Sequence, residues 1–419
     1  MKIHADPDDG LVDQEVAIRL SDCPPGAPVM IRASAVDDSG HQWRSQVTLV
    51  ADSGGCIDVT KQSPVAGTYD GVEPMGLFWS MVLDPSVDER HRFMKKGADP
   101  DHITITAEVR GSRDVSIDVV RRYMAPGLIS TDLREHGLVG TLFLHPGERR
   151  PAIISMTGSG GGEVKDHSAL LASHGFTCLS LAYFNAEGLP AGLWEIPLEY
   201  FAKAIEWLSA QDSVIPDRIG VTGISKGGEL SLLLGATFPE IRAVVAHVPS
   251  NVVWTGLGPG YERGERSSWM FRGQPFPFLA GKAERVDWSK RPVRLVDYYS
   301  SGIEDRAAME RAEIAVEKIY GPIMMLSGTD DAMWPSTWFC ELVMERLKRK
   351  GFRHRFEHLC YEGAGHPIFH PYMPCTAIEA VHPVTRILVT VGGTPKVNAH
   401  ACSDSWPKVL VFFHEALGC

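Results

Sequence analysis

The stretch VTGISKGGEL, residues 221–230, places Ser225 among three glycines between two apolar runs. The residues before it, RIGVT, have the pattern of a buried strand, and those after it, ELSLLLGA, that of a buried helix. Gly223-Ile224-Ser225-Lys226-Gly227 therefore has G-x-S-x-G spacing at a strand–turn–helix junction. Glycines let such a tight turn form, and the turn presents the serine Oγ above the sheet. A plain Gly/Ser turn is the alternative, but the context favours a nucleophilic Ser225.

The chain around this stretch alternates strands and helices from about residue 138 onward. Apolar segments predict strands at 140–146, 152–158, 177–184, 218–224, 243–249, 322–328 and 356–362. Further segments predict helices at 168–175, 198–211, 228–238, 336–351 and 406–418. This order indicates an α/β fold whose mostly parallel sheet has helices on both faces. Residues 251–305, rich in Gly, Pro, Arg and aromatic residues, break the rhythm and are predicted to be an insertion or cap.

Residues 1–130 have a different pattern, with short alternating apolar and polar segments separated by turns. These segments are 15–20, 28–36, 45–51, 103–109 and 115–124. Short strands at this spacing predict an antiparallel β-sandwich of the immunoglobulin-like kind. Residues 124–137 read as the connection out of it. We therefore expect a sandwich domain over 1–130 and an α/β catalytic domain over 131–419.

A serine nucleophile needs a base and a group that orients the base, and in α/β-hydrolases these follow in the order Ser, acid, His. His366 follows the strand at 356–362 in the sequence GAGHP and is the predicted base. Asp330 and Asp331 both follow the strand at 322–328. The loop spacing favours Asp331 as the acid, with Asp330 capping the loop.

Charge must also be stabilised on the carbonyl oxygen that the serine attacks. One predicted donor is the backbone N–H of Lys226, directly after the nucleophile. The other is expected from Ser159 or Gly160, in the glycine-rich run that follows the strand at 152–158. A flexible glycine loop is the alternative reading of that run.

Composition excludes several other classes. The net charge of −11 argues against nucleic-acid binding. The first residues lack a signal or transit pattern, and no window resembles a membrane span, so a cytoplasmic enzyme is expected. The eight cysteines are scattered with no C-x-x-C pair, which argues against a structural metal site.

Several segments together resemble one known family. They are EPMGLFWSM (73–81), GLVGTLFLHPGERRPAIISMTGSGGG (137–162), GISKGGELSL (223–232), SGTDDAMW (327–334), YEGAGHPIFHPYMP (361–374) and HACSDSWPKVLVFFHEALG (400–418). The chain is similar, nearly from end to end, to acyl-CoA thioesterases and bile acid-CoA:amino acid N-acyltransferases. The resemblance implies a β-sandwich followed by an α/β-hydrolase domain. It also implies the triad Ser225, Asp331 and His366.

The resemblance favours hydrolysis, because the amino-acid-conjugating members have cysteine where this chain has Ser225. A serine thioesterase acting on an acyl-CoA is therefore expected, with no cofactor beyond the CoA of the substrate. Acyl transfer to an amine or alcohol, an esterase, and a thioesterase for a carrier-bound chain remain alternatives. A carrier protein is acidic, so the last alternative predicts a basic patch from Arg263, Arg266 and Arg272. A non-catalytic protein that binds partners through its sandwich is disfavoured by the filled triad.

Overall fold

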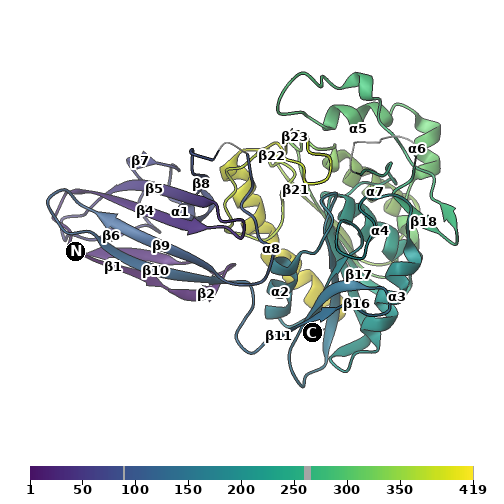
Figure 1. The fold of residues 1–419 in the computed structure, drawn as a ribbon, viewed down its shortest axis with the longest axis horizontal. Coiled ribbons are helices and arrows are strands. Elements are labelled where there is room, and N and C mark those ends of the chain that lie inside the picture. The colour runs from purple at the N-terminus through teal and green to yellow at the C-terminus, as the bar shows by residue number, and fades with distance from the viewer. Residues whose placement is uncertain (88–89, 259–265, 419) are drawn as a thin grey trace.

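The computed structural model describes residues 1–87, 90–258 and 266–418, which form an N-terminal β-sandwich and a larger α/β part (Figure 1). One sheet of the sandwich has the order β1–β3–β6, with bounds Lys2–Asp6, Ala17–Ser21 and Ile57–Asp58. The other has the order β2–β10–β9–β4–β5–β7, with bounds Asp9–Leu11, Val115–Arg122, Asp101–Glu108, Pro28–Val36, Gln42–Val50 and Ala66–Gly67. The short strand β8 (Val82–Leu83) pairs with β5, and the short helix α1 spans Gly76–Trp79.

The two sandwich sheets enclose one apolar core. Ile18 and Leu20 of β3 belong to the same buried cluster as Ile31 of β4, Trp43 of β5 and Ile105 of β9. Buried and more exposed side chains alternate along β4 and β5, because successive side chains of a strand point to opposite faces. The described pairs are antiparallel, as the alternation predicted, except that β2 and β10 run parallel.

The α/β part is built on an eight-stranded sheet with the order β11–β12–β14–β13–β16–β17–β20–β21. The bounds in that order are Ile129–Leu133, Val139–Leu144, Thr177–Ala182, Arg150–Met156, Val214–Ile224, Ile241–His247, Ile323–Gly328 and Phe356–Tyr361. The pairs from β14 through β21 are parallel, and the pairs β11–β12 and β12–β14 at one edge are antiparallel. This is the mostly parallel sheet that the sequence predicted. Strand β11 was missed and lies in the expected connection.

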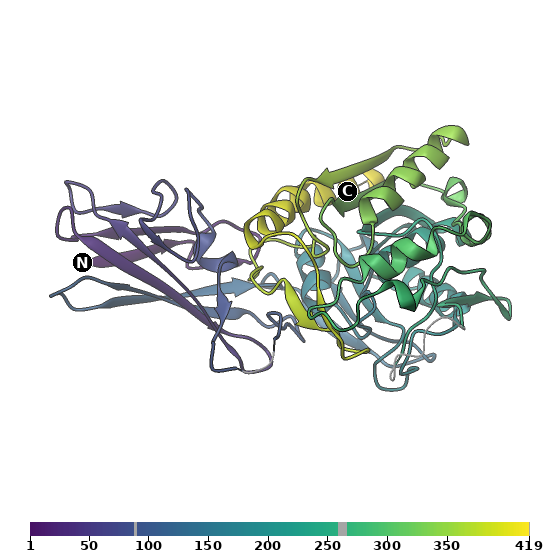
Figure 2. The same ribbon diagram turned by 90° about the horizontal axis from the view of Figure 1, so that it is seen from above.

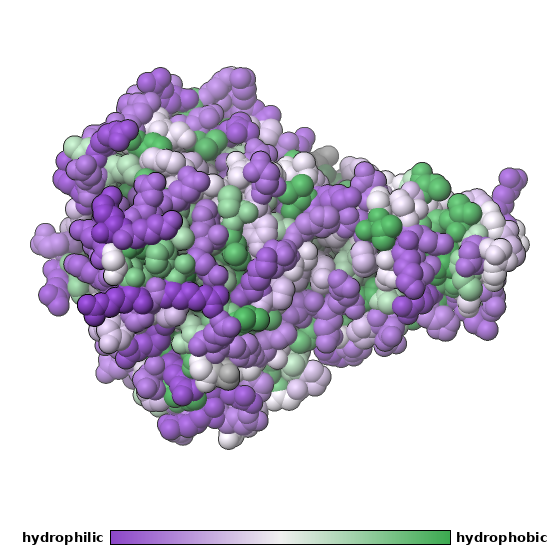
Figure 3. Space-filling view, turned by 180° about the vertical axis from the view of Figure 1, so that it is seen from behind, coloured by the Kyte–Doolittle hydropathy of each residue, from purple (hydrophilic) through white to green (hydrophobic). Residues whose placement is uncertain are grey.

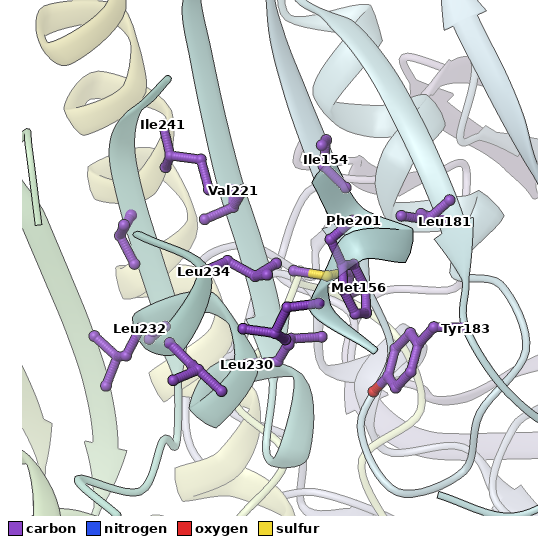
Figure 4. Packing of buried hydrophobic residues seen from close by; sticks show 14 of the residues in the cluster. Ile154, Met156, Leu181, Tyr183, Phe201, Val221, Leu230, Leu232, Leu234 and Ile241 are labelled. Atoms are coloured by element: carbon purple, nitrogen blue, oxygen red, sulfur yellow. The ribbon is translucent and has the colours of Figure 1, made fainter. Parts of the chain in front are cut away.

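Helices cover both faces of this sheet. Helices α2 (Lys165–Ser173) and α8 (Pro395–Leu417) pack on one face, and α3 (Leu198–Ser209), α4 (Lys226–Thr237) and α7 (Ser336–Arg349) on the other. Successive residues of β13 point to opposite faces: Ile153 packs with α2 and α8, and Ile154 packs with α3, α4 and α7. Figure 4 shows Met156 and Val221 of the sheet close to Leu234 of α4. Burial on both faces explains the continuous apolar strands.

The crossover between β17 and β20 contains the expected insertion. Its described elements are β18 (Trp269–Phe271), β19 (Gln274–Pro275), the 3₁₀ turn η1 (Ala283–Arg285) and α5 (Val296–Gly302). Helix α6 (Arg306–Ala312) and the turn η2 (Val316–Lys318) follow, and β18 also pairs with the two-residue strand β15 (Ile196–Pro197). In Figure 1 the insertion lies at the same end of the sheet as the hairpin β22–β23 (Glu379–Val381 and Leu388–Thr390), which the sequence did not predict.

The C-terminal segment joins the sandwich to the catalytic sheet. In both ribbon views α8 lies between them (Figures 1 and 2), and Lys396 near its start forms ion pairs with Asp70 and Glu73 of the sandwich, both at 3.0 Å. The sandwich sheets end with β10, and the expected boundary at residue 130 falls just inside β11. Helix α8 begins eleven residues before the predicted start at 406, because the Thr394 side chain caps the Val397 N–H and Pro395 occupies the first turn.

One face of the molecule is mainly polar. Figure 3 shows the face turned away from the viewer in Figure 1, where hydrophilic residues predominate and apolar residues form small separate groups. Within the described part of the chain, no helix combines the length and the apolar character needed to cross a bilayer.

A group of buried histidines lies beneath the sheet end where α2 meets α8. The His167 ring of α2 stacks on Phe369 with ring centroids 3.7 Å apart and contacts the edge of Trp406 at 5.2 Å. Neither ring nitrogen of His167 has a hydrogen-bond partner among the described protein groups. Burial, and then the nearby His370 and His247, hold the pKa of His167 well below its usual value. His167 is therefore neutral in the folded protein at neutral pH.

We expect His167→Phe to stabilise the protein, and to do so more strongly in acid. The substitution keeps the ring stack and removes two unpaired polar atoms, which cost about 1–3 kcal/mol. Below pH 6.5 the unfolded histidine binds a proton and the folded one does not, so wild-type stability falls with pH. Thermal unfolding at pH 7.5 and 5.5 should show the gap between variant and wild type widening by up to about 1.4 kcal/mol. An unchanged gap would contradict a neutral buried His167.

Candidate active site

Ser225 occupies the turn between β16, which ends at Ile224, and α4, which begins at Lys226. Its backbone has φ 60° and ψ −118°, a conformation that non-glycine residues rarely adopt and that costs about 1–3 kcal/mol. Its N–H donates to the carbonyl of His247 at the end of β17, and its carbonyl accepts from Glu229 N–H, at 2.8 and 2.9 Å. The strained turn is thus held from both sides.

The flanking glycines are required by close backbone contacts. A Cβ at Gly223 would lie 2.5 Å from the carbonyl oxygen of Gly227. A Cβ at Gly227 would lie 2.3 Å from the carbonyl oxygen of Thr157, at the end of the neighbouring strand β13. Both contacts are with backbone, so a side chain could not be accommodated by a rotamer change. The G-x-S-x-G spacing is therefore a steric requirement of this turn.

His366 and Asp331 form a buried pair on the loops after β21 and β20. His366 Nδ1 lies 2.8 Å from Asp331 Oδ2, and each residue is only 6% exposed. Asp331 also accepts hydrogen bonds from Met333 N–H at 2.9 Å and from the Ser336 hydroxyl at 2.7 Å. With the carboxylate on Nδ1–H, the Nε2 of His366 is left as the proton acceptor.

Asp330, the neighbouring carboxylate, has a different environment. Its side chain is exposed and accepts a hydrogen bond from the Gly393 N–H at 3.0 Å, which ties the loop to the start of α8. Only Asp331 of the two contacts the imidazole of His366.

Ser225 and His366 border one cavity of about 290 Å³. Its other described lining residues come from the glycine-rich loop, the sandwich, the loop after β20 and the β22–β23 hairpin. They are Arg90, His91, Arg92, Met94, Gly158, Ser159, Gly160, Ile224, Met333, Ala380, Val381, His382, Pro383 and Val389. The cavity is therefore assembled from segments separated by nearly 300 residues of chain.

The three expected oxyanion residues lie beside this cavity. Lys226 and Ser159 border a narrow recess at Ser225, and Gly160 lines the main cavity. The Lys226 N–H is the first of α4, and a helix has no internal acceptor for it. The Ser159 hydroxyl is engaged by His382 Nε2 at 2.8 Å, and the Gly160 carbonyl accepts from the Asn185 side chain at 2.8 Å. We therefore expect the oxyanion donor from this loop to be a backbone N–H group and not a side chain.

The Lys226 side chain has a structural role that the sequence did not reveal. Its Nζ lies 2.6 Å from Glu229 Oε1, and the two side chains are 2% and 0% exposed. Glu229 also accepts a hydrogen bond from Trp269 Nε1 at 2.7 Å. Burial lowers the pKa of Lys226 and raises that of Glu229, and the attraction between them opposes both shifts. The pair anchors the start of α4 to the insertion.

We expect Lys226→Met to destabilise the protein by about 3–5 kcal/mol, because it leaves Glu229 as an uncompensated buried charge. The double variant Lys226→Met/Glu229→Leu removes both charges and should recover most of that loss. Chemical denaturation of wild type and both variants provides the comparison. Equal losses in the single and double variants would show that the stability does not depend on charge pairing.

Several lining residues were missed by sequence reasoning. Arg90, His91 and Arg92 belong to the basic run before β9, and His382 lies in a hairpin whose two short strands carry no clear periodicity. The only available signal was the density of charge in RHRFMKK, residues 90–96.

The described arginines of the basic patch predicted to bind a carrier protein do not line the cavity. Arg266 is paired with Glu195 at 2.7 Å, and neither Arg266 nor Arg272 lines the cavity. Arg263 lies outside the described residues. The described cations at the cavity therefore come from the sandwich and not from the insertion.

Comparisons with known proteins cover both parts of the chain. Residues 13–135 match the family described as "Acyl-CoA thioester hydrolase/BAAT N-terminal region", and residues 196–419 match "BAAT / Acyl-CoA thioester hydrolase C terminal". The mouse protein "Acyl-coenzyme A thioesterase 1" is 30% identical over 97% of this chain and 94% of its own length. The human "Acyl-coenzyme A thioesterase 2, mitochondrial" is 30% identical over 97% of this chain and 82% of its own.

Solved structures are more distant. A puromycin-hydrolysing peptidase of Mycobacterium tuberculosis is 14% identical, with a TM-score of 0.45 over 96% of this chain and 58% of its own. A putative dienelactone hydrolase of Klebsiella pneumoniae is 16% identical, with a TM-score of 0.41 over 69% of this chain and 99% of its own.

Proposed function

Because this chain belongs to the acyl-CoA thioester hydrolase/BAAT family, we propose that it cleaves the thioester bond of an acyl-CoA with Ser225 as nucleophile. The observation that carries the proposal is the pairing of His366 with Asp331 at the cavity that Ser225 lines from its strained turn. A base oriented by a buried carboxylate, next to a serine at the start of a helix, is the arrangement that acyl transfer requires.

In the first half-reaction Ser225 Oγ attacks the thioester carbonyl carbon while His366 Nε2 takes the hydroxyl proton. The carbonyl oxygen becomes negatively charged and accepts hydrogen bonds from the Lys226 N–H and from an N–H of Ser159 or Gly160. The intermediate then collapses, the carbon–sulfur bond breaks, and His366 returns the proton to the leaving thiolate. The products are free CoA and an acyl ester on Ser225.

In the second half-reaction a water replaces the thiol. His366 takes a proton from the water, the resulting hydroxide attacks the ester carbonyl, and Ser225 leaves with the proton that His366 held. The acid is released and the enzyme is restored. Every proton is moved by His366, so we propose that the reaction needs no cofactor other than the CoA of the substrate.

The alternatives differ in the acceptor or the carrier. An amine or alcohol in place of the water would make the protein an acyltransferase, and an oxygen ester or a carrier-bound acyl chain would use the same residues. Cytoplasmic location also stays a prediction, and one of the relatives is named as mitochondrial.

The test is thiol release from a panel of acyl-CoAs that runs from short to long and from branched to aromatic. Each reaction is run with and without glycine or taurine, and the acyl product is identified by mass spectrometry. Release of free acid at a rate independent of the amine supports the hydrolase. Release that requires the amine and yields an amide would establish the acyltransferase instead.

A further inference from the structure

The charge of the active-site cavity is opposite to that of the protein. The chain has a net charge of −11, yet the described residues that line the cavity include Arg90, Arg92 and three histidines and no carboxylate. A local basic pocket on an acidic protein concentrates anions at that place. The cavity is thus electrostatically suited to a negatively charged ligand.

Most of these basic groups already have partners. Arg90 forms an ion pair with Glu379 of β22. The His91 ring stacks on His41 of the sandwich with centroids 4.5 Å apart, and His382 is hydrogen-bonded to Ser159. Arg90 and His91 also border a neighbouring cavity of about 350 Å³, so they form the wall between the two spaces.

Arg92 differs from them in both respects. It lines the cavity of Ser225 and His366 but not the neighbouring cavity, and no hydrogen bond or ion pair joins it to any residue that the structure describes. Desolvation by the surrounding protein lowers the pKa of Arg92 to about 10, so its guanidinium remains charged at neutral pH, and the residue keeps exposed surface. A guanidinium presents several N–H donors in a plane that matches a carboxylate or phosphate.

We propose that Arg92 binds an anionic group of the substrate, and that this anion is a carboxylate at the far end of the acyl group. The inference rests on the proposed function and specifies its substrate class as the thioester of a short dicarboxylic acid. The enzyme would then hydrolyse a thioester whose acyl group carries its own negative charge.

The size of the cavity favours the acyl group over CoA as the source of the anion. A sphere of 290 Å³ is about 8 Å across, and Arg92 shares this space with the nucleophile. The pantetheine arm has the length of roughly four extended residues, so it can hold the phosphates of CoA about 15 Å from the sulfur. A carboxylate a few carbons from the thioester carbonyl fits within the cavity, whereas the phosphates would lie outside it.

The test is a four-substrate comparison that separates the two sources of negative charge. Hexanoyl and adipoyl groups have the same number of carbons and differ in the terminal carboxylate. Each is presented on CoA and on N-acetylcysteamine, which has no phosphate. Wild type, Arg92→Gln and Arg92→Lys are measured on all four, with Lys96→Gln as a control that removes an exposed positive charge from the same run without lining the cavity.

We expect Arg92→Gln to lower kcat/KM for both adipoyl thioesters by about 10- to 100-fold, the usual loss for a charge-assisted hydrogen bond. Both hexanoyl thioesters should change less than about 3-fold, Arg92→Lys should retain part of the adipoyl activity, and Lys96→Gln should match wild type. If Arg92→Gln instead lowered kcat/KM for both CoA thioesters and for neither N-acetylcysteamine thioester, Arg92 would bind the phosphates of CoA. That result would overturn the proposal. An equal loss on all four substrates would also overturn it.

A binding measurement separates this inference from the proposed function. Calorimetry with Ser225→Ala needs no turnover and compares adipoyl-CoA with hexanoyl-CoA, with and without the additional Arg92→Gln change. Tighter binding of adipoyl-CoA that disappears with Arg92→Gln supports the anion site even if hydrolysis fails. Equal binding of the two thioesters overturns the anion site even if both are hydrolysed.

Discussion

We expect Ser225→Ala to lower the kcat of acyl-CoA hydrolysis by about 10⁴- to 10⁶-fold, the loss typical of removing the nucleophile of a serine triad. Alanine has no Oγ to form the acyl ester, so only the oxyanion donors and substrate binding remain to assist direct attack by water. Thiol release under single-turnover conditions is the measurement, because a slow residual rate would be lost beneath background hydrolysis in a steady-state assay.

The fold should tolerate this change. The Ser225 backbone contacts are made by its N–H and carbonyl, which alanine retains, so thermal unfolding should change little. Ser403→Ala is the matched control, since that hydroxyl donates to the His400 carbonyl within α8 and Ser403 does not line the cavity. If Ser225→Ala kept more than about a tenth of wild-type kcat, another group would have to be the nucleophile, because removing the nucleophile of a serine triad costs far more than that.

Asp331→Asn is expected to lower kcat by about 10³- to 10⁴-fold while leaving the fold in place. The amide is nearly the same size as the carboxylate, but its NH₂ can donate to Nδ1 and so favours the wrong tautomer, with the proton on Nε2. His366 then cannot accept the Ser225 proton. The lost carboxylate also no longer stabilises the imidazolium that forms during attack.

Asp330→Asn provides a control one residue away. The Asp330 side chain accepts the Gly393 N–H, and the amide oxygen of asparagine can still accept it, so kcat should change less than about 3-fold. The pair of variants decides which aspartate orients the base, because both carry the same chemical change on one loop. If the two substitutions lowered kcat equally, the activity would depend on the conformation of the loop and not on the contact between Asp331 and His366.

Local features of the sequence were enough to identify the elements around the site. The Ser225 turn could be predicted because steric exclusion at Gly223 and Gly227 depends on residues within the same few positions or on the adjacent strand. Asp331 and His366 could be predicted because the carboxyl ends of parallel strands meet at one edge of the sheet. Of the two aspartates, Asp331 contacts the imidazole, and its role as the triad acid stays a prediction.

Helix α8 shows where local rules failed. The sequence predicted a helix only over 406–418, and Pro407 near its start lacks the N–H for the helical ladder. In the structure the helix starts at Pro395 and continues through Pro407. The buried face that includes Trp406, Val409 and Phe413 packs on the sheet, and this tertiary burial outweighs one missing hydrogen bond.

The sequence by itself determined the order of the elements, the mostly parallel sheet and the three residues expected to react, because each depends on periodicity, turn sterics or strand ends. Only the tertiary structure decided which residues surround them. Arg92 of the sandwich and His382 of a short hairpin reach the cavity of Ser225 through contacts between parts distant in the chain. No local pattern encodes such an approach, because it results from how the separately folded sheets and loops pack together.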